Sequence, residues 1–141
     1  MMTCRMWREQ RRLADALIEL ARSDVDWRPD AAELALRLAE VYDKGAQDDQ
    51  ARDAARRVAE GRLTVITGGP GTGKTFGIKR VLAILLESAR RDGQDLVIEL
   101  AAPTGKAAVR MAEAMADAGG LARFSAETRH ALQRLEPRTL H

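Results

Sequence analysis

The stretch Gly68-Gly69-Pro70-Gly71-Thr72-Gly73-Lys74-Thr75 has the complete pattern of a phosphate-binding loop, G-x-x-x-x-G-K-[ST]. The apolar segment 63–67 before it predicts a short buried strand, and the segment 76–90 after it predicts a helix. In that context the glycines let successive backbone N–H groups point at an anion, and the helix N-terminus adds its positive dipole end. Lys74 can then reach the β- and γ-phosphates of a nucleotide, and the Thr75 hydroxyl can ligate Mg²⁺. The alternative is a glycine-rich turn without a ligand; the agreement of loop and flanking segments favours the phosphate site.

The composition is that of one globular domain. The chain has 141 residues, of which 45% are hydrophobic and 31% charged, and its formal net charge is +2. A net charge this small argues neither for nor against a nucleic-acid partner. Cys4 is the single cysteine, which excludes an internal disulfide and fits a reducing compartment. The sequence has no apolar segment of the roughly 18 residues that a membrane span needs, and no signal-peptide core. We therefore expect a cytoplasmic protein with no membrane partner.

The first 60 residues predict three helices. The helix expected at 8–22 has an apolar stripe, formed by Leu13, Leu17, Leu20 and Ala21. Asp30 is expected to start the second helix, with Glu33 as its capping-box partner. The third helix is expected at 48–60 and is rich in Ala and Arg.

The second half of the chain predicts alternating strands and helices. The expected elements are strand 63–67, helix 74–90, strand 96–102, helix 105–118 and a short helix at 128–135. This order gives an α/β fold, with a helical lead-in followed by two βα units of a parallel sheet. Two parallel strands do not form an independent sheet, because both faces and both edges need cover. We therefore expect the sequence to stop inside a domain.

A second motif, Ala101-Ala102-Pro103-Thr104-Gly105-Lys106-Ala107-Ala108, joins the second expected strand to the next helix. Ligands of open α/β sheets bind at the carboxyl ends of the strands, so this motif is expected on the same rim as the phosphate loop. It offers a hydroxyl group, an exposed amide and a lysine near a helix start, all of which suit a phosphate. A helix start with a solvated lysine is the alternative reading of the same residues.

Together, GGPGTGKT and a strand ending in APTGKAA resemble the RecD family, the alpha subunit of exodeoxyribonuclease V, among the superfamily 1 DNA helicases. The resemblance implies a RecA-like P-loop NTPase domain. In that family APTGKAA is motif Ia, which lines the channel for single-stranded DNA. By resemblance, Thr104, Gly105 and Lys106 would contact DNA.

Further likenesses extend over most of the chain. Asp48-Asp49-Gln50 resembles the family's Q-motif, which implies that Gln50 reads the edge of adenine. The segment 128–132 resembles the family's T-x-H-x-L element, which implies DNA contacts for Thr128 and His130. Residues 5–9 resemble the tail of the family's N-terminal domain. If the resemblance is set aside, the alternative interpretation is that Gln50 is a solvated surface side chain and that His130 is packed against an apolar helix face.

The chain also departs from the family pattern. Phe76 stands where family members usually carry a threonine after GKT. Nothing after Thr128 resembles the Asp-Glu pair that holds magnesium and positions the attacking water, and the later helicase motifs are missing. We expect 1–45 to be a helical N-terminal segment or linker, and 46–141 to be a partial, truncated P-loop helicase domain.

By resemblance, the sequence predicts part of an ATP-dependent helicase subunit of DNA repair and recombination that translocates 5′ to 3′. ATP and Mg²⁺ are the expected cofactors. The expected partners are single-stranded DNA and the larger helicase and nuclease subunits of an exodeoxyribonuclease V complex. In this prediction Lys74 and Thr75 serve catalysis, although the 141-residue chain alone is expected to be inactive. One rival is a non-catalytic nucleotide- and DNA-binding remnant, and another is an unrelated small P-loop kinase, against which APTGKAA argues.

Overall fold

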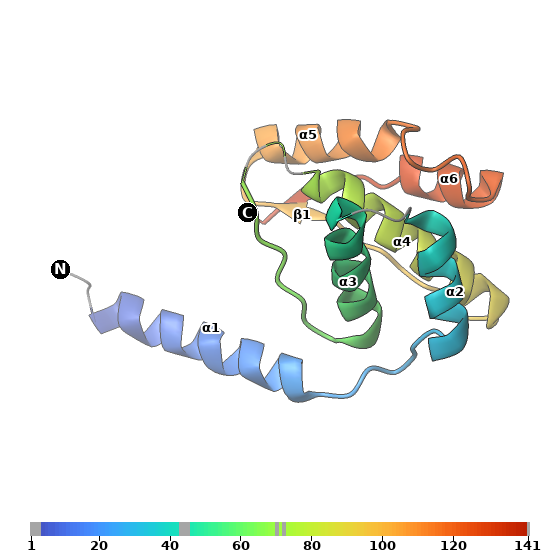
Figure 1. Ribbon diagram of the computed structural model, residues 1–141. Coiled ribbons are helices and arrows are strands. Elements are labelled where there is room, and N and C mark those ends of the chain that lie inside the picture. Colours follow the sequence, from blue (N-terminus) through green and yellow to red (C-terminus); the bar gives the residue numbers. More distant parts are fainter. Residues whose placement is uncertain (1–3, 43–45, 70, 72, 141) are drawn as a thin grey trace.

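The chain folds mainly into helices, with one small parallel sheet (Figure 1). The computed structural model describes residues 4–42, 46–69, 71 and 73–140. The elements in chain order are α1 (Cys4–Arg22), α2 (Ala31–Val41), α3 (Ala46–Glu60), α4 (Lys74–Arg91), β1 (Ala101–Ala102), α5 (Gly105–Ala116), α6 (Ala126–Gln133) and β2 (Arg138–Thr139).

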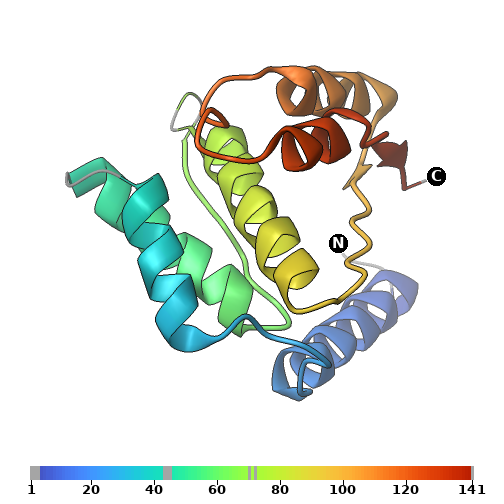
Figure 2. The same ribbon diagram turned by 90° about the vertical axis from the view of Figure 1, so that its right-hand side faces the viewer.

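Helix α4, which follows the phosphate loop, is the centre of the molecule. It packs against α2 and α3 on one side and against α5 and α6 on the other (Figures 1 and 2). Its middle part, residues 77–89, is buried or half-buried on every face, as in a helix with neighbours on several sides. The buried apolar ones are Val81, Ala83, Ile84, Leu86 and Ala89. The expected helix at 74–90 is thus confirmed and forms the core of the fold.

Helix α2 begins where the sequence predicts. The Asp30 side chain accepts hydrogen bonds from the backbone N–H groups of Ala32 and Glu33, each at 3.0 Å, which satisfies two donors that a helix start leaves open. Leu34 and Leu38 are buried in the same apolar cluster as residues of α3 and α4. Residues before position 45 therefore share a core with residues after it, and the domain boundary expected there stays a prediction.

A half-buried carboxylate connects three helices around this core. Glu87 of α4 accepts a hydrogen bond from Arg37 of α2 at 2.7 Å and another from the backbone N–H of Ser125 at 2.7 Å. Ser125 is the N-cap of α6. Because only 11% of the Glu87 side chain is exposed, these charge-assisted bonds are poorly screened by water and fix α2 and α6 against α4.

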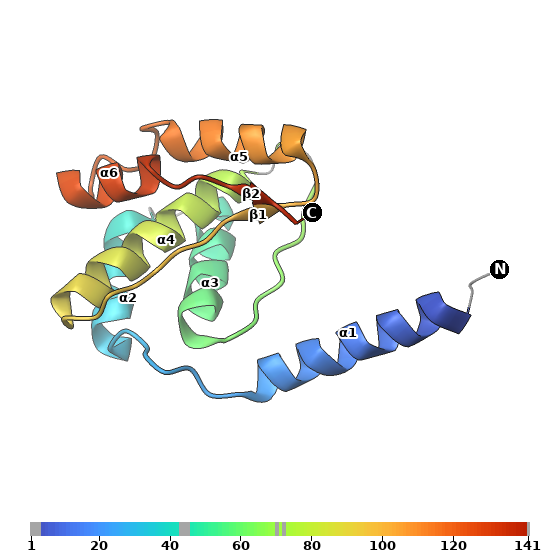
Figure 3. The ribbon, with the colours of Figure 1, turned by 180° about the vertical axis from the view of Figure 1, so that it is seen from behind.

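The expected sheet is formed only in part. β1 and β2 pair in parallel, with Ala101 opposite Arg138 and Ala102 opposite Thr139 (Figure 3). The prediction of a strand at 63–67 is wrong for this structure, and of the strand expected at 96–102 only the last two residues are paired. A strand needs a hydrogen-bonded neighbour, and neither segment has a backbone ladder with the other. Accordingly, Val65 and Val97 are each 77% exposed.

Helix α1 is confirmed as a helix, but it lies apart from the other helices (Figures 1 and 2). Its apolar stripe is exposed, with Leu13 at 60% and Leu17 at 40%. The segment after it is attached to the core, since the indole Nε1 of Trp27 donates to Asp92 Oδ2 at 2.9 Å and Arg62 donates to the carbonyl oxygen of Asp24. None of the helices in the described part of the chain has the length and apolar character that crossing a bilayer demands.

Candidate nucleotide and DNA site

The phosphate loop has the backbone that its glycines predict. Gly71 and Gly73 have φ angles of 75° and 72°, in the left-handed region that only glycine adopts without strain. Gly73 is also the N-cap of α4. The loop therefore turns sharply and delivers the chain directly into the first turn of the central helix. Pro70 and Thr72 lie outside the described residues.

The start of α4 has no side-chain cap. The N-cap Gly73 has no side chain that could accept hydrogen bonds from the N–H groups of the first turn. The first backbone bond of the helix is from Gly77 to Gly73, at 2.8 Å, and the N–H groups before it have no acceptor within the helix. These donors and the positive end of the helix dipole point to the same place, which is the arrangement that binds phosphate.

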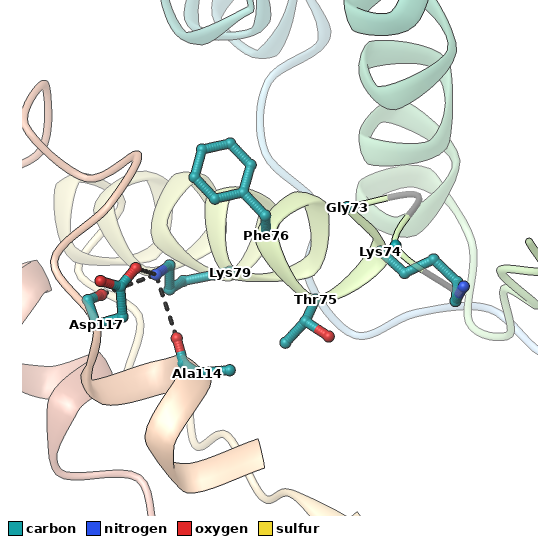
Figure 4. A pocket seen from close by; sticks show the side chains of 8 residues that line it. Gly73, Lys74, Thr75, Phe76, Lys79, Ala114 and Asp117 are labelled. Carbon is teal, nitrogen blue, oxygen red and sulfur yellow. Dashed lines mark hydrogen bonds and ion pairs between the residues drawn. The ribbon is translucent and has the colours of Figure 1, made fainter. Parts of the chain in front are cut away.

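Lys74 lies back over the loop. Its ammonium donates to the carbonyl oxygen of Gly68 at 2.7 Å and to that of Gly69. Thr75, the next residue, is exposed at the mouth of a pocket (Figure 4). A nucleotide phosphate would take over from these carbonyl oxygens as the partner of the ammonium, and the Thr75 hydroxyl is accessible to a metal ion. The geometry of loop, lysine and hydroxyl thus fits a nucleotide with Mg²⁺.

The described residues contain no cluster of three or more His, Cys, Asp or Glu side chains that could hold a metal ion by itself. Among the described residues, the Thr75 hydroxyl is the protein oxygen at this pocket that would suit a Mg²⁺ ion bound with a nucleotide. Keeping several waters and binding through one protein oxygen and phosphate oxygens is the usual behaviour of Mg²⁺ in nucleotide sites.

A pocket of about 520 Å³ opens beside the loop, between the start of α4 and the end of α5. It is lined by Gly71, Gly73, Lys74, Thr75, Phe76, Lys79, Ala114 and Asp117. Figure 4 shows Lys79 and Asp117 turned toward each other at one end of the pocket and Lys74 at the other. Sequence reasoning missed Lys79, although it stands on the same helix stripe as the buried residues Ala83 and Leu86.

Phe76, the departure from the family pattern, packs against the segment that follows α5. A Cβ atom at Gly120 would overlap the Phe76 ring, so the ring lies directly over that glycine. The guanidinium of Arg80 stacks on Phe76 at 4.4 Å from the ring centroid and on Tyr42 at 5.3 Å. These contacts join the first turns of α4 to the α5–α6 connection, which passes close to them in Figure 2.

The second motif forms the start of α5. Thr104 is the N-cap, and its Oγ1 accepts a hydrogen bond from the Ala107 N–H at 3.2 Å. Its hydroxyl proton can still be donated, because a hydroxyl group is both donor and acceptor. Gly105 and Lys106 are exposed in the first turn. The three residues of this motif that are expected to contact DNA therefore lie together at an accessible helix start.

The other three expected site residues differ in accessibility. Gln50 is exposed on α3, and His130 is exposed on α6. Thr128 is completely buried, and its hydroxyl oxygen accepts hydrogen bonds from Arg90 at 2.7 Å and from Ser125 at 3.0 Å. In this structure the Thr128 hydroxyl thus holds α6 against α4, and Gln50 and His130 have their polar groups at the surface.

Comparison with known proteins agrees with this class of fold and site. A family model described as an AAA domain matches residues 51–141, which contain the phosphate loop and all the helices from α4 onward. The chain therefore belongs to the AAA domain family, a class of P-loop nucleotide-binding proteins, and within it to the RecD proteins, as its similarity to curated relatives shows.

The chain is 41% identical to the RecBCD enzyme subunit RecD of Mycobacterium tuberculosis over 138 residues, which are 97% of this chain and 22% of that protein. It is 36% identical to the same subunit of Haemophilus influenzae over 102 residues, 70% of this chain and 16% of that protein. It is 47% identical to the ATP-dependent RecD2 DNA helicase of Deinococcus radiodurans over 70 residues, half of this chain and 9% of that protein. The chain thus spans about a fifth, or less, of the length of these relatives.

Proposed function

We propose that this chain is the ATP-binding and single-stranded-DNA-binding part of a 5′-to-3′ DNA helicase subunit in a RecBCD-type repair and recombination enzyme. The glycine-capped helix start after the phosphate loop, with Lys74 and Thr75 in its first turn beside the pocket, carries the proposal. The relatives named as RecBCD subunits and as an ATP-dependent DNA helicase support the choice of ATP, DNA and partner subunits.

In this proposal the residues divide into two sites. Lys74 and the loop amides hold the nucleotide phosphates, Thr75 ligates Mg²⁺, and Gln50 hydrogen-bonds the adenine edge. Thr104, Gly105 and Lys106 contact the DNA backbone at the start of α5, and His130 makes a separate DNA contact from α6. The buried Thr128 has no part in DNA binding in this proposal, because its hydroxyl group is used inside the protein.

The DNA half of the proposal is tested with Lys106→Ala. Lys106 is exposed and contributes a single positive charge. Its loss should therefore weaken binding to all single-stranded sequences equally, and it should reduce by one the number of DNA phosphates whose counterions are released on binding. For single strands this is a change of about 0.7 in the slope of log affinity against log salt. Fluorescence anisotropy with a labelled oligothymidylate across a salt series measures it.

Arg12→Ala is the matched control, because Arg12 is an exposed cation on the separate helix α1. It should leave the salt slope unchanged, and ATP affinity should be unchanged in both variants. A Lys106→Ala slope equal to that of the unmodified chain would remove the start of α5 from the DNA site.

A further inference from the structure

A lysine is buried at the contact between α4 and α5. Lys79 is 2% exposed, although a lysine side chain is almost never buried without partners. It stands five residues after Lys74 on the same helix, and neither the phosphate site nor the DNA site described above uses it.

The ammonium of Lys79 closes the end of α5. It donates to the carbonyl oxygen of Ala114 at 3.2 Å, to the carbonyl oxygen of Asp117 at 2.7 Å and to Asp117 Oδ2 at 3.1 Å (Figure 4). The last carbonyl groups of a helix have no partner within the helix and form the negative end of its dipole. A cation placed there satisfies both the hydrogen bonds and the charge.

Asp117 completes the contact from the other side. Its carboxylate also accepts the N–H of Gly119 at 3.0 Å. The hydrogen bond from Lys79, followed by that of Gly119, holds the pKa of Asp117 below its ordinary value, so the carboxylate stays ionised opposite the ammonium. Three directional bonds from one side chain thus connect α4 to α5.

The two ends of α5 lie at different proposed sites. Its C-terminal end is bonded to Lys79, beside the pocket of the phosphate loop. Its start carries Thr104 and Lys106, and the helix has 12 residues, or a length of about 18 Å. A helix of this length moves as a rigid body. A shift of the C-terminal end of α5, next to the phosphate loop, therefore displaces the N-terminal end that is proposed to contact DNA.

Packing alone does not require a charge at this position. Burying an ammonium costs free energy that an apolar side chain of the same size would not, and such pairs are poor sources of stability. Hydrogen bonds, however, fix the rotation and the position of one helix relative to another more tightly than apolar contacts do. We propose that Lys79, with Asp117, is a positioning residue that couples the nucleotide site to the DNA site through α5. This inference rests on the proposed function.

The test is the coupling factor, the ratio of the affinities for labelled oligothymidylate with and without a saturating non-hydrolysable ATP analogue and Mg²⁺. Coupling between sites is typically 5- to 150-fold. In the unmodified chain we expect a factor in that range, and in Lys79→Met a factor below about 2. Each ligand alone should still bind Lys79→Met, and Lys79→Arg should restore part of the coupling.

Two further variants separate coupling from stability. Leu132→Ala removes a buried side chain of α6 away from the contact, so it lowers stability but keeps the coupling factor. Asp117→Asn removes charge from a largely exposed side chain, so it decides the question if Lys79→Met does not fold, with a reduced factor expected. Unchanged coupling in the Lys79 and Asp117 variants, or an equal loss in Leu132→Ala, would overturn the inference. If the unmodified chain binds both ligands without coupling, the inference alone fails; if it binds neither, the proposed function fails as well.

Discussion

The contact between Gly120 and Phe76 gives a quantitative test of how the start of α4 is packed. Gly120 has a φ angle of 75°, and an added Cβ would overlap the Phe76 ring and approach Arg80 Nε to 3.3 Å. Gly120→Ala therefore combines two costs. A left-handed backbone at a residue with a Cβ costs about 1–2 kcal/mol, and forcing a packed ring aside costs about 1–3 kcal/mol.

Gly93→Ala isolates the first of these costs. Gly93 has a φ angle of 67°, but no atom lies within 4 Å of its added Cβ. We expect Gly93→Ala to lower the free energy of unfolding by about 1–2 kcal/mol, and Gly120→Ala by about 2–5 kcal/mol. Urea unfolding followed by circular dichroism measures both, and the entropy that alanine removes from the unfolded chain is the same for the two variants.

A double-mutant cycle identifies the ring as the cause. In a Phe76→Ala background, Gly120→Ala should lose the clash with the ring and keep the backbone cost and the looser approach to Arg80, so the interaction energy is about 1–3 kcal/mol. Equal costs of Gly120→Ala in both backgrounds would refute the packing of Phe76 over Gly120.

Three further predictions concern single side chains. Because the pKa of Asp117 is lowered in the folded state, its ionised carboxylate stabilises the fold at pH values above the ordinary carboxyl pKa near 4. This contribution is lost as the pH falls through the lower pKa of the folded state. NMR titration should show a higher pKa of Asp117 in Lys79→Met, and an unchanged pKa would contradict the pairing. Gln50→Ala should narrow the preference for ATP over GTP by about 0.5–1.5 kcal/mol, and an unaltered ratio in calorimetry would return Gln50 to a surface role. Thr128→Val should lower the unfolding free energy by about 1–3 kcal/mol, because Arg90 loses its buried acceptor, whereas a loss of DNA affinity without a loss of stability would place Thr128 in the DNA site.

Local sequence patterns predict the helices and the phosphate loop well, because their causes are local. Asp30 caps α2, and the glycines at 71 and 73 have the left-handed angles that the loop motif requires. Apolar periodicity likewise places α4. Each of these features depends on residues within a turn or two of one another, which the sequence displays directly.

The strands and the contacts between helices were harder to predict, because they depend on distant residues. The apolar segment around Val65 predicts a strand, but pairing depends on a neighbour, and β1 finds its partner in residues 138–139. Thr128 belongs to a motif that predicts DNA contacts, yet its buried hydroxyl oxygen accepts a hydrogen bond from Arg90, 38 residues away. The burial of Lys79 depends in the same way on the end of α5.

Isothermal titration calorimetry of ATP with Mg²⁺ tests the central claim, that the loop before α4 binds nucleotide phosphates through Lys74. We expect the unmodified chain to bind, and Lys74→Ala to abolish measurable binding. In the proposed site, the ammonium that now donates to the carbonyl oxygens of Gly68 and Gly69 is the cation for the β- and γ-phosphates. Loss of such charge-assisted bonds costs at least about 1.5–3 kcal/mol, or roughly 10- to 150-fold in affinity. Lys106→Ala, with the same change of charge at the start of α5, should bind ATP as the unmodified chain does. Equal ATP affinities of Lys74→Ala and the unmodified chain would contradict the account.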